Sequence, residues 1–79
     1  MEVKKQKTLS LKDSFIRQME KDILSGRLSV GQKLPSEREL AERFAVSKAV
    51  IHAGILEMEE NGFVLVRPRV GTFVSDFRM

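Results

Sequence analysis

The 79-residue chain contains no cysteine, no tryptophan and no tyrosine, and it has two prolines and one histidine. Without cysteine, disulfide bonds and thiolate metal sites are excluded. No apolar run approaches the roughly 18–20 residues that span a membrane, so we expect no membrane segment. A single histidine, together with the lack of a glycine-rich phosphate loop, leaves little from which to build a catalytic centre. We therefore expect no enzyme, no metal site and no cofactor.

Charged residues make up 32 % of the chain, with 14 Lys and Arg against 11 Asp and Glu and a formal net charge of +3. A chain of this length forms one domain with one small core. We expect residues 1–9 to be a flexible basic arm, residues 10–75 to be the folded domain, and residues 76–79 to begin a linker or tail. The basic start lacks the apolar segment of a secretory signal, so a cytoplasmic location is the default.

The first predicted helix covers residues 11–25. Ser10 precedes it as an N-cap candidate, and Gly26 follows it as a residue suited to the left-handed conformation of a helix end. At helical spacing, the apolar residues form one stripe that we expect to face the core. The members of this stripe are Leu11, Phe15, Ile16, Met19, Ile23 and Leu24.

Two further helix starts lie close together in the middle of the chain. In the stretch L-P-S-E-R-E-L-A, Ser36 and Glu39 have the form of a capping box, which predicts a helix over residues 37–44. Ser47 is another N-cap candidate and predicts a helix over residues 48–60. A short helix, a tight turn and a second helix that starts with a basic residue are typical of a helix-turn-helix.

The C-terminal part predicts a β-hairpin. Residues 63–67 and 72–74 are rich in β-branched and aromatic side chains, and the turn between them carries basic residues. The segment 27–35 is expected to be extended, with a turn near Gly31, and could add a short edge strand. This order predicts a mainly α fold, a winged helix-turn-helix of three helices plus a two- or three-stranded wing.

A longer pattern makes the interpretation more specific. The run G-x-L-x-x-G-x-x-L-P-S-E-R-E-L-A, from Gly26 to Ala41, is followed by V-S-K at residues 46–48. This run resembles the DNA-binding domain of the GntR family of bacterial transcription regulators. The N-G-F-V and G-T-F-V steps around the hairpin also fit, so the resemblance covers about residues 10 to 75.

The resemblance implies sequence-specific binding of double-stranded DNA, with helix 48–60 in the major groove and hairpin 63–74 as the wing. It also implies a homodimer on a palindromic operator. Members of the family usually carry a second domain that binds a small metabolite, and we expect this effector-binding domain to be absent from the chain. The alternative is a winged helix that binds another protein and no DNA.

The same resemblance suggests individual DNA contacts. It implies that Arg38 and Lys48 contact DNA, that His52 occupies a position where the family commonly has arginine, and that Gly71 lies at the wing tip. From the helical spacing, Ala49 shares a face with Lys48 and His52. The full set of candidates is Ser36, Arg38, Ser47, Lys48, Ala49, His52, Arg67, Arg69 and Gly71.

Each candidate also has a simpler interpretation. Arg38 could pair with Glu42 one turn later, and His52 could be an ordinary surface residue. The serines are first of all caps, although a cap hydroxyl can also touch phosphate. Basic residues of a hairpin are often plain exposed side chains.

An acidic block and a glycine complete the sequence pattern of helix 48–60. Glu57, Glu59 and Glu60 would repel DNA, so we expect this end of the helix to point away from it. Gly54 in the helix interior is expected to cost about 0.5–1 kcal/mol relative to alanine.

Overall fold

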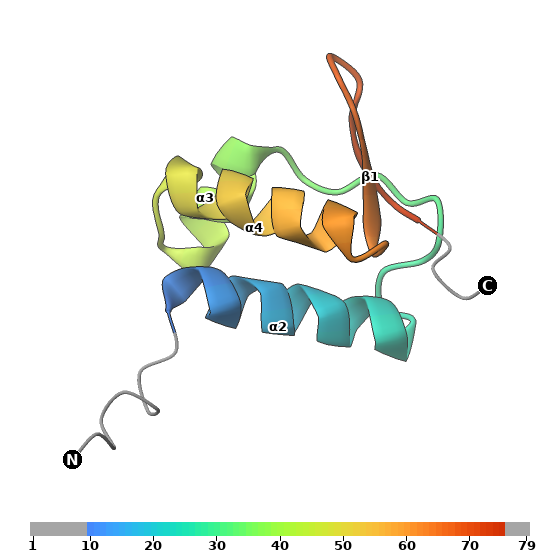
Figure 1. Ribbon diagram of the computed structural model, residues 1–79, viewed down its shortest axis with the longest axis horizontal. Helices are drawn as coiled ribbons and strands as arrows, with labels where there is room; N and C mark the ends of the chain where they lie inside the picture. Colours follow the sequence, from blue (N-terminus) through green and yellow to red (C-terminus); the bar gives the residue numbers. More distant parts are fainter. Residues whose placement is uncertain (1–9, 76–79) are drawn as a thin grey trace.

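The computed structural model describes residues 10–75, so the expected arm and tail lie outside the described residues. The element order is α2 (Leu11–Ser25), α3 (Glu37–Phe44), α4 (Lys48–Glu60), β1 (Val64–Arg67) and β2 (Gly71–Val74), as Figure 1 shows. All three helices begin and end at the predicted residues. The structure therefore confirms a mainly α fold with a small hairpin, a winged helix-turn-helix.

Each helix begins at a serine that caps it. Ser10 and Ser47 each accept the backbone N–H three residues further along, at 3.0 and 3.2 Å. At the start of α3 the capping box is complete, because Ser36 accepts the Glu39 N–H at 3.1 Å and the Glu39 carboxylate accepts the Ser36 N–H at 3.0 Å. These bonds satisfy donors that a helix cannot satisfy itself. The helix starts are thus set by local sequence.

The turn between α3 and α4 contains no glycine. Ala45 takes the left-handed conformation there, with φ of 56°. The N–H of Val46 donates to the carbonyl oxygen of Ala41 at 3.1 Å, which closes the end of α3. A left-handed alanine costs roughly 1–2 kcal/mol, so the tertiary contacts of the two helices have to hold this turn.

The hydrophobic core lies between the three helices and one face of the hairpin. α2 packs along α4, α3 packs against the same helix, and β1 meets its C-terminal end. The buried side chains are Phe15, Ile16, Met19, Ile23, Leu34, Leu40, Ile51, Ile55, Met58, Val64 and Val74.

The predicted stripe of α2 is wrong at both ends. Leu11 and Leu24 are 60 % and 65 % exposed. At 100° per residue, both lie about 100° or more from the centre of the buried residues of this helix. The predicted apolar stripe is therefore wider than the face of α2 that is buried against α4.

An ion pair joins α2 to α4. The ammonium of Lys12 lies 3.0 Å from a carboxylate oxygen of Glu57. The hydrogen bond and charge of this carboxylate raise the pKa of Lys12. A pKa raised by folding favours the folded state below the ordinary lysine value of 10.5, and the contribution is lost as the pH rises past the folded value. The pair is therefore present across the neutral range.

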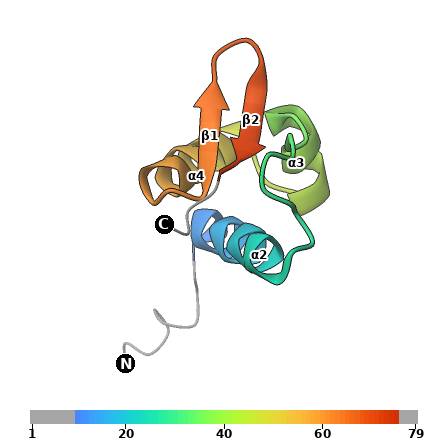
Figure 2. The same ribbon diagram turned by 90° about the vertical axis from the view of Figure 1, so that its right-hand side faces the viewer.

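The wing gains a third stretch of chain. β1 and β2 pair antiparallel, with Val64 opposite Val74 and Arg67 opposite Gly71. On the other edge of β2, the N–H of Leu34 donates to the Thr72 oxygen at 2.8 Å. The short edge strand considered for residues 27–35 is reduced to one antiparallel bridge, between Lys33 and Phe73. Figure 2 shows the two strands side by side, standing away from α2.

A glycine governs how closely α2 approaches α4. Gly54 is buried, and a Cβ added to it would lie 2.6 and 2.8 Å from two ring carbons of Phe15, too close for carbon atoms. The ring of Phe15 also meets the ring of Phe44 edge-on, with centroids 5.0 Å apart. From the sequence, Gly54 was expected only to lower the stability of the helix. The structure shows why a glycine is present, because the ring of Phe15 occupies the space that the methyl group of an alanine would need.

We expect Gly54→Ala to lower the free energy of unfolding by about 1–3 kcal/mol through overpacking against Phe15. This loss occurs although alanine favours a helix by about 0.5–1 kcal/mol over glycine. Urea-induced unfolding followed by circular dichroism measures the change.

The neighbouring exposed position supplies the control, because Ala53→Gly changes helix propensity without touching Phe15. In a Phe15→Leu background the added methyl group has room, so Gly54→Ala should become neutral or stabilising. An equal effect of Gly54→Ala in both backgrounds would show that the phenylalanine ring does not select this glycine.

Candidate nucleic-acid interface

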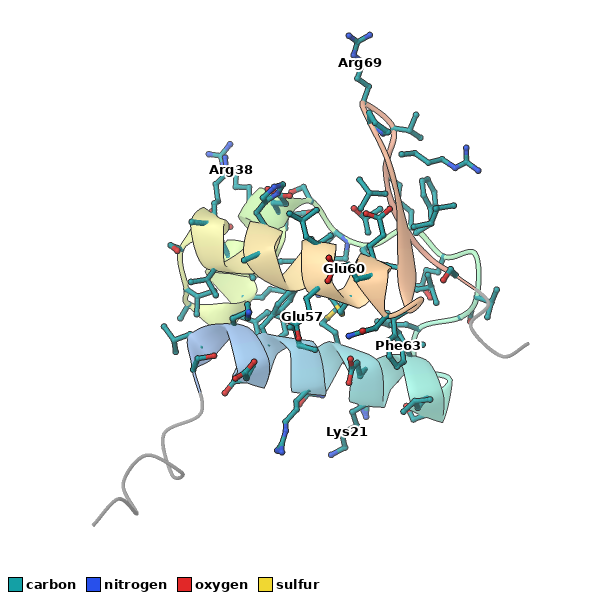
Figure 3. The ribbon with its side chains drawn as sticks, viewed as in Figure 1. Lys21, Arg38, Glu57, Glu60, Phe63 and Arg69 are labelled. Carbon is teal, nitrogen blue, oxygen red and sulfur yellow. The ribbon has the colours of Figure 1, made fainter. Side chains whose placement is uncertain are left out.

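Two of the candidate arginines extend from the same side of the molecule. Arg38 lies in the first turn of α3, and Arg69 lies at the tip of the hairpin. Figure 3 shows both side chains pointing away from α2, whereas Lys21 extends from α2 on the opposite side. Within residues 10–75, Arg38 forms no ion pair with Glu42, which was the simpler interpretation of this residue. Its guanidinium is exposed and available to a ligand.

The start of α4 offers an exposed turn of helix. Lys48 and Ala49 are both exposed, and the hydroxyl of Ser47 serves as the cap. In the described part of the chain, the ammonium of Lys48 has no carboxylate within ion-pair distance. The backbone N–H groups and the dipole of a helix N-terminus attract anions such as phosphate.

His52, one turn further along α4, has a partner that the sequence did not predict. Its Nδ1 lies 2.8 Å from a carboxylate oxygen of Glu37, in the first turn of α3. The side chains are 58 % and 37 % exposed, so the pair lies at the surface. The two residues are 15 apart in sequence, and only the crossing of α3 and α4 brings them together.

The wing tip is a tight turn with an arginine in an unfavourable conformation. The N–H of Val70 donates to the Arg67 oxygen at 3.0 Å, and Pro68 and Arg69 are the central residues. Arg69 has φ of 67°, the conformation that turns of this kind usually give to glycine or asparagine. An arginine kept there is presented at the outermost point of the hairpin.

Gly71 lies beside the tip and not at it. It is the first residue of β2, with φ of 145°, a conformation that side chains rarely adopt. A Cβ there would lie 2.6 Å from Cε of Lys33, whose side chain crosses the strand at this point. The wing-tip position expected for Gly71 belongs to Pro68 and Arg69, because β2 begins one residue earlier than the β-branched run indicated.

A groove of about 840 Å³ runs between the hairpin and the segment that leads into α3. Its basic lining residues are Lys33, Arg43, Arg67 and Arg69. Glu37 and Glu39, in the first turn of α3, also line this groove. Arg67 and Arg69 were predicted as site residues from the sequence. Lys33 and Arg43 were not, because no local motif marks residues that meet only in the folded chain.

Comparison with known proteins agrees with this architecture. The family profile described as "Bacterial regulatory proteins, gntR family" matches residues 11–74. The chain belongs to the GntR family. Because this match covers most of the chain, the resemblance inferred from the sequence is confirmed.

Several curated transcription regulators are similar to this chain over most of its length. It is 36 % identical over 69 residues to the transcriptional regulator Mce2R of Mycobacterium tuberculosis, covering 87 % of this chain and 29 % of that protein. It is 30 % identical over 79 residues to the transcriptional repressor NagR of Bacillus subtilis, covering 100 % of this chain and 32 % of that protein. The chain thus spans about a third of these relatives.

Solved structures give the same result for the fold. The DNA-binding domain of AraR, crystallised with operator ORX1, matches with a TM-score of 0.85 and 27 % identity, covering 89 % of this chain and 84 % of that one. YtrA of Sulfolobus acidocaldarius, a GntR-family transcription factor, matches with a TM-score of 0.80 and 28 % identity, covering 87 % of this chain and 59 % of that one.

The described part of the GntR domain contains neither a candidate membrane span nor a candidate metal site. No helix among residues 10–75 is long and apolar enough to cross a membrane. The same residues contain no group of three or more His, Asp or Glu side chains that could hold a metal ion.

The acidic block at the end of α4 has structural partners. Glu59 accepts the backbone N–H of Val66 at 3.1 Å, which ties β1 of the wing to the helix. Glu57 pairs with Lys12 of α2, while Glu60 is exposed. Two of the three carboxylates thus hold α4 in position, a function that the charge pattern did not reveal.

We expect Glu59→Ala to loosen the wing of the GntR domain. It removes the acceptor of a partly buried N–H, so the amide of Val66 should exchange with solvent faster and the free energy of unfolding should fall by about 1 kcal/mol. Hydrogen exchange followed by NMR measures both.

Glu60→Ala is the matched control, since it removes the same charge from an exposed neighbour. If the two variants exchange the Val66 amide at equal rates, Glu59 does not anchor the hairpin.

Proposed function

We propose that this GntR-family domain binds double-stranded DNA in a sequence-specific manner, as the DNA-binding part of a cytoplasmic transcription regulator. The observation that carries the proposal is the position of three exposed cations. Arg38 and Arg69 extend from the side opposite α2, and Lys48 begins the helix that a helix-turn-helix inserts into DNA. The similarity to AraR, whose structure includes operator DNA, supports the same conclusion.

In this proposal the N-terminal turns of α4 enter the major groove. Lys48, Ala49 and His52 face the base edges, while Ile51 and Ile55 on the other side of the helix hold it to the core. A lysine contacts guanine or phosphate as a point charge, without the two-pronged geometry of arginine. Ser47 and Ser36 cap the two helices and lie exposed, where phosphate can reach them.

Arg38 and the wing hold the DNA backbone on either side. Arg38 contacts phosphate beside the major groove, and Arg67 and Arg69 contact the next stretch of backbone or the minor groove. The side chain of Lys33, which fills the space beside Gly71, adds positive charge close to the wing tip. Contacts of this kind set affinity and register but carry little sequence information.

A second copy completes the complex. One domain with so few base contacts binds weakly, and two domains on the half-sites of a palindrome supply affinity and specificity together. The curated relatives extend well beyond the part that matches this chain. We propose that the regulator responds to a small-molecule effector through a part outside this domain.

We expect the Arg38→Ala, Lys48→Ala double variant to bind duplex DNA at least tenfold more weakly than the parent chain. Each cation releases counterions from phosphate, so the slope of log K against log salt should also fall by roughly 2. Fluorescence anisotropy at several salt concentrations measures both, using a duplex selected by the parent chain from a pool with a randomised centre.

Arg17→Ala, Lys21→Ala on α2 is the control, because it removes the same charge from exposed residues on the opposite side. If both double variants lose the same affinity, binding follows net charge and no defined interface exists. If the parent selects no duplex at all, DNA recognition is wrong, and the alternative of a module that binds another protein is favoured.

Arg69→Gly separates binding from stability at the wing tip. Glycine adopts a positive φ without strain, so the free energy of unfolding should stay unchanged or rise by up to about 1 kcal/mol. DNA affinity should nevertheless fall severalfold, because the outermost cation of the wing is lost. Thermal unfolding and anisotropy measure the two quantities.

Arg69→Lys keeps the charge at the tip and should retain most of the affinity. Unchanged binding by Arg69→Gly would remove the wing tip from the interface.

A further inference from the structure

We propose that Glu37 is a positioning residue that makes His52 read an amino group on a DNA base. The proposal rests on the DNA-binding function above and deepens it, because it states which chemical group this helix selects. The contact that carries it is the 2.8 Å approach of His52 Nδ1 to the Glu37 carboxylate.

An ionised carboxylate has no proton to give, so it acts only as an acceptor. The contact therefore needs a proton on Nδ1 of His52. In a neutral imidazole one nitrogen donates and the other accepts, which leaves Nε2 with a free lone pair. Glu37 thereby selects one of two tautomers and, with it, the hydrogen-bonding character of the other nitrogen.

The position of the ring gives this choice a consequence. His52 lies on the second turn of α4, on the same exposed face as Lys48, and 58 % of its side chain is exposed. In the major groove, adenine N6 and cytosine N4 carry amino donors, whereas guanine presents two acceptors at its edge. An accepting Nε2 matches adenine or cytosine and rejects guanine.

The arrangement also changes what this position can recognise relative to an arginine. The arginine guanidinium donates hydrogen bonds but accepts none, so it pairs with the two acceptors of guanine. A histidine held by Glu37 has the opposite character, although both are basic residue types. Glu37 lies on α3, outside the reading helix, and acts only through the orientation and tautomer of the ring.

The first test needs no DNA. Because the chain has a single histidine, a long-range proton–nitrogen NMR spectrum shows one imidazole. At about pH 8.5, where an imidazole is neutral, we expect the parent chain to carry the proton on Nδ1. Glu37→Ala should move it toward Nε2, and Glu42→Ala, an equal change of charge on the same helix, should not.

The second test uses duplexes selected from a randomised pool at the same pH. His52→Ala identifies the base pair that His52 reads, as the position where discrimination is lost. There the parent and Glu42→Ala should favour adenine or cytosine over guanine by about fivefold, the effect of one neutral hydrogen bond. Glu37→Ala should lose or reverse this preference while still binding DNA.

The outcomes separate the two proposals. A proton on Nε2 in the parent chain, or a tautomer unchanged by Glu37→Ala, would overturn the positioning function of Glu37. A parent preference for guanine, or a preference that Glu37→Ala retains, would overturn the reading function of His52. If no variant selects any duplex, DNA binding fails and base reading fails with it, while the NMR result still decides whether Glu37 sets the tautomer.

Discussion

The close packing of α2 on α4 is the contact on which the other features depend. Phe15 of α2 occupies the space that a side chain at Gly54 of α4 would fill. Phe44 of α3 packs edge-on against the same phenylalanine ring. One aromatic ring thus touches all three helices. Because it sets the distance and crossing of the helices, it also decides which face of α4 remains exposed.

Polar contacts at the surface build on this packing. Glu57 ties α4 to α2, Glu59 ties it to β1, and the carboxylate of Glu37 reaches it from α3. Each links α4 to a different element, so the helix proposed to read DNA is held on several sides. The two exposed pairs, Lys12–Glu57 and Glu37–His52, add little stability individually. Their value lies in fixing orientation, which a reading helix needs more than stability.

Local patterns predicted the helices and the family correctly because their causes are local. A serine cap needs only its own hydroxyl and an N–H three residues away, as Ser36 and Ser47 show. The positions of side chains across elements were harder to predict. Leu11 was expected in the core and is exposed, because a stripe in sequence does not show how wide a face the partner helix covers. Gly71 was placed at the wing tip, one residue from where the turn ends.

The sequence by itself determined the order of elements, the helix boundaries and the run of residues that marks a GntR domain, because caps, turns and apolar spacing act over a few residues. The tertiary structure alone decided which polar groups meet. His52 and Glu37 are 15 residues apart, and Lys33 crosses β2 beside Gly71. Hydrogen bonds depend on distance in space, and the crossing of α3 and α4 brings such groups together. The site was therefore visible in sequence as a set of cations, while its chemistry depends on the fold.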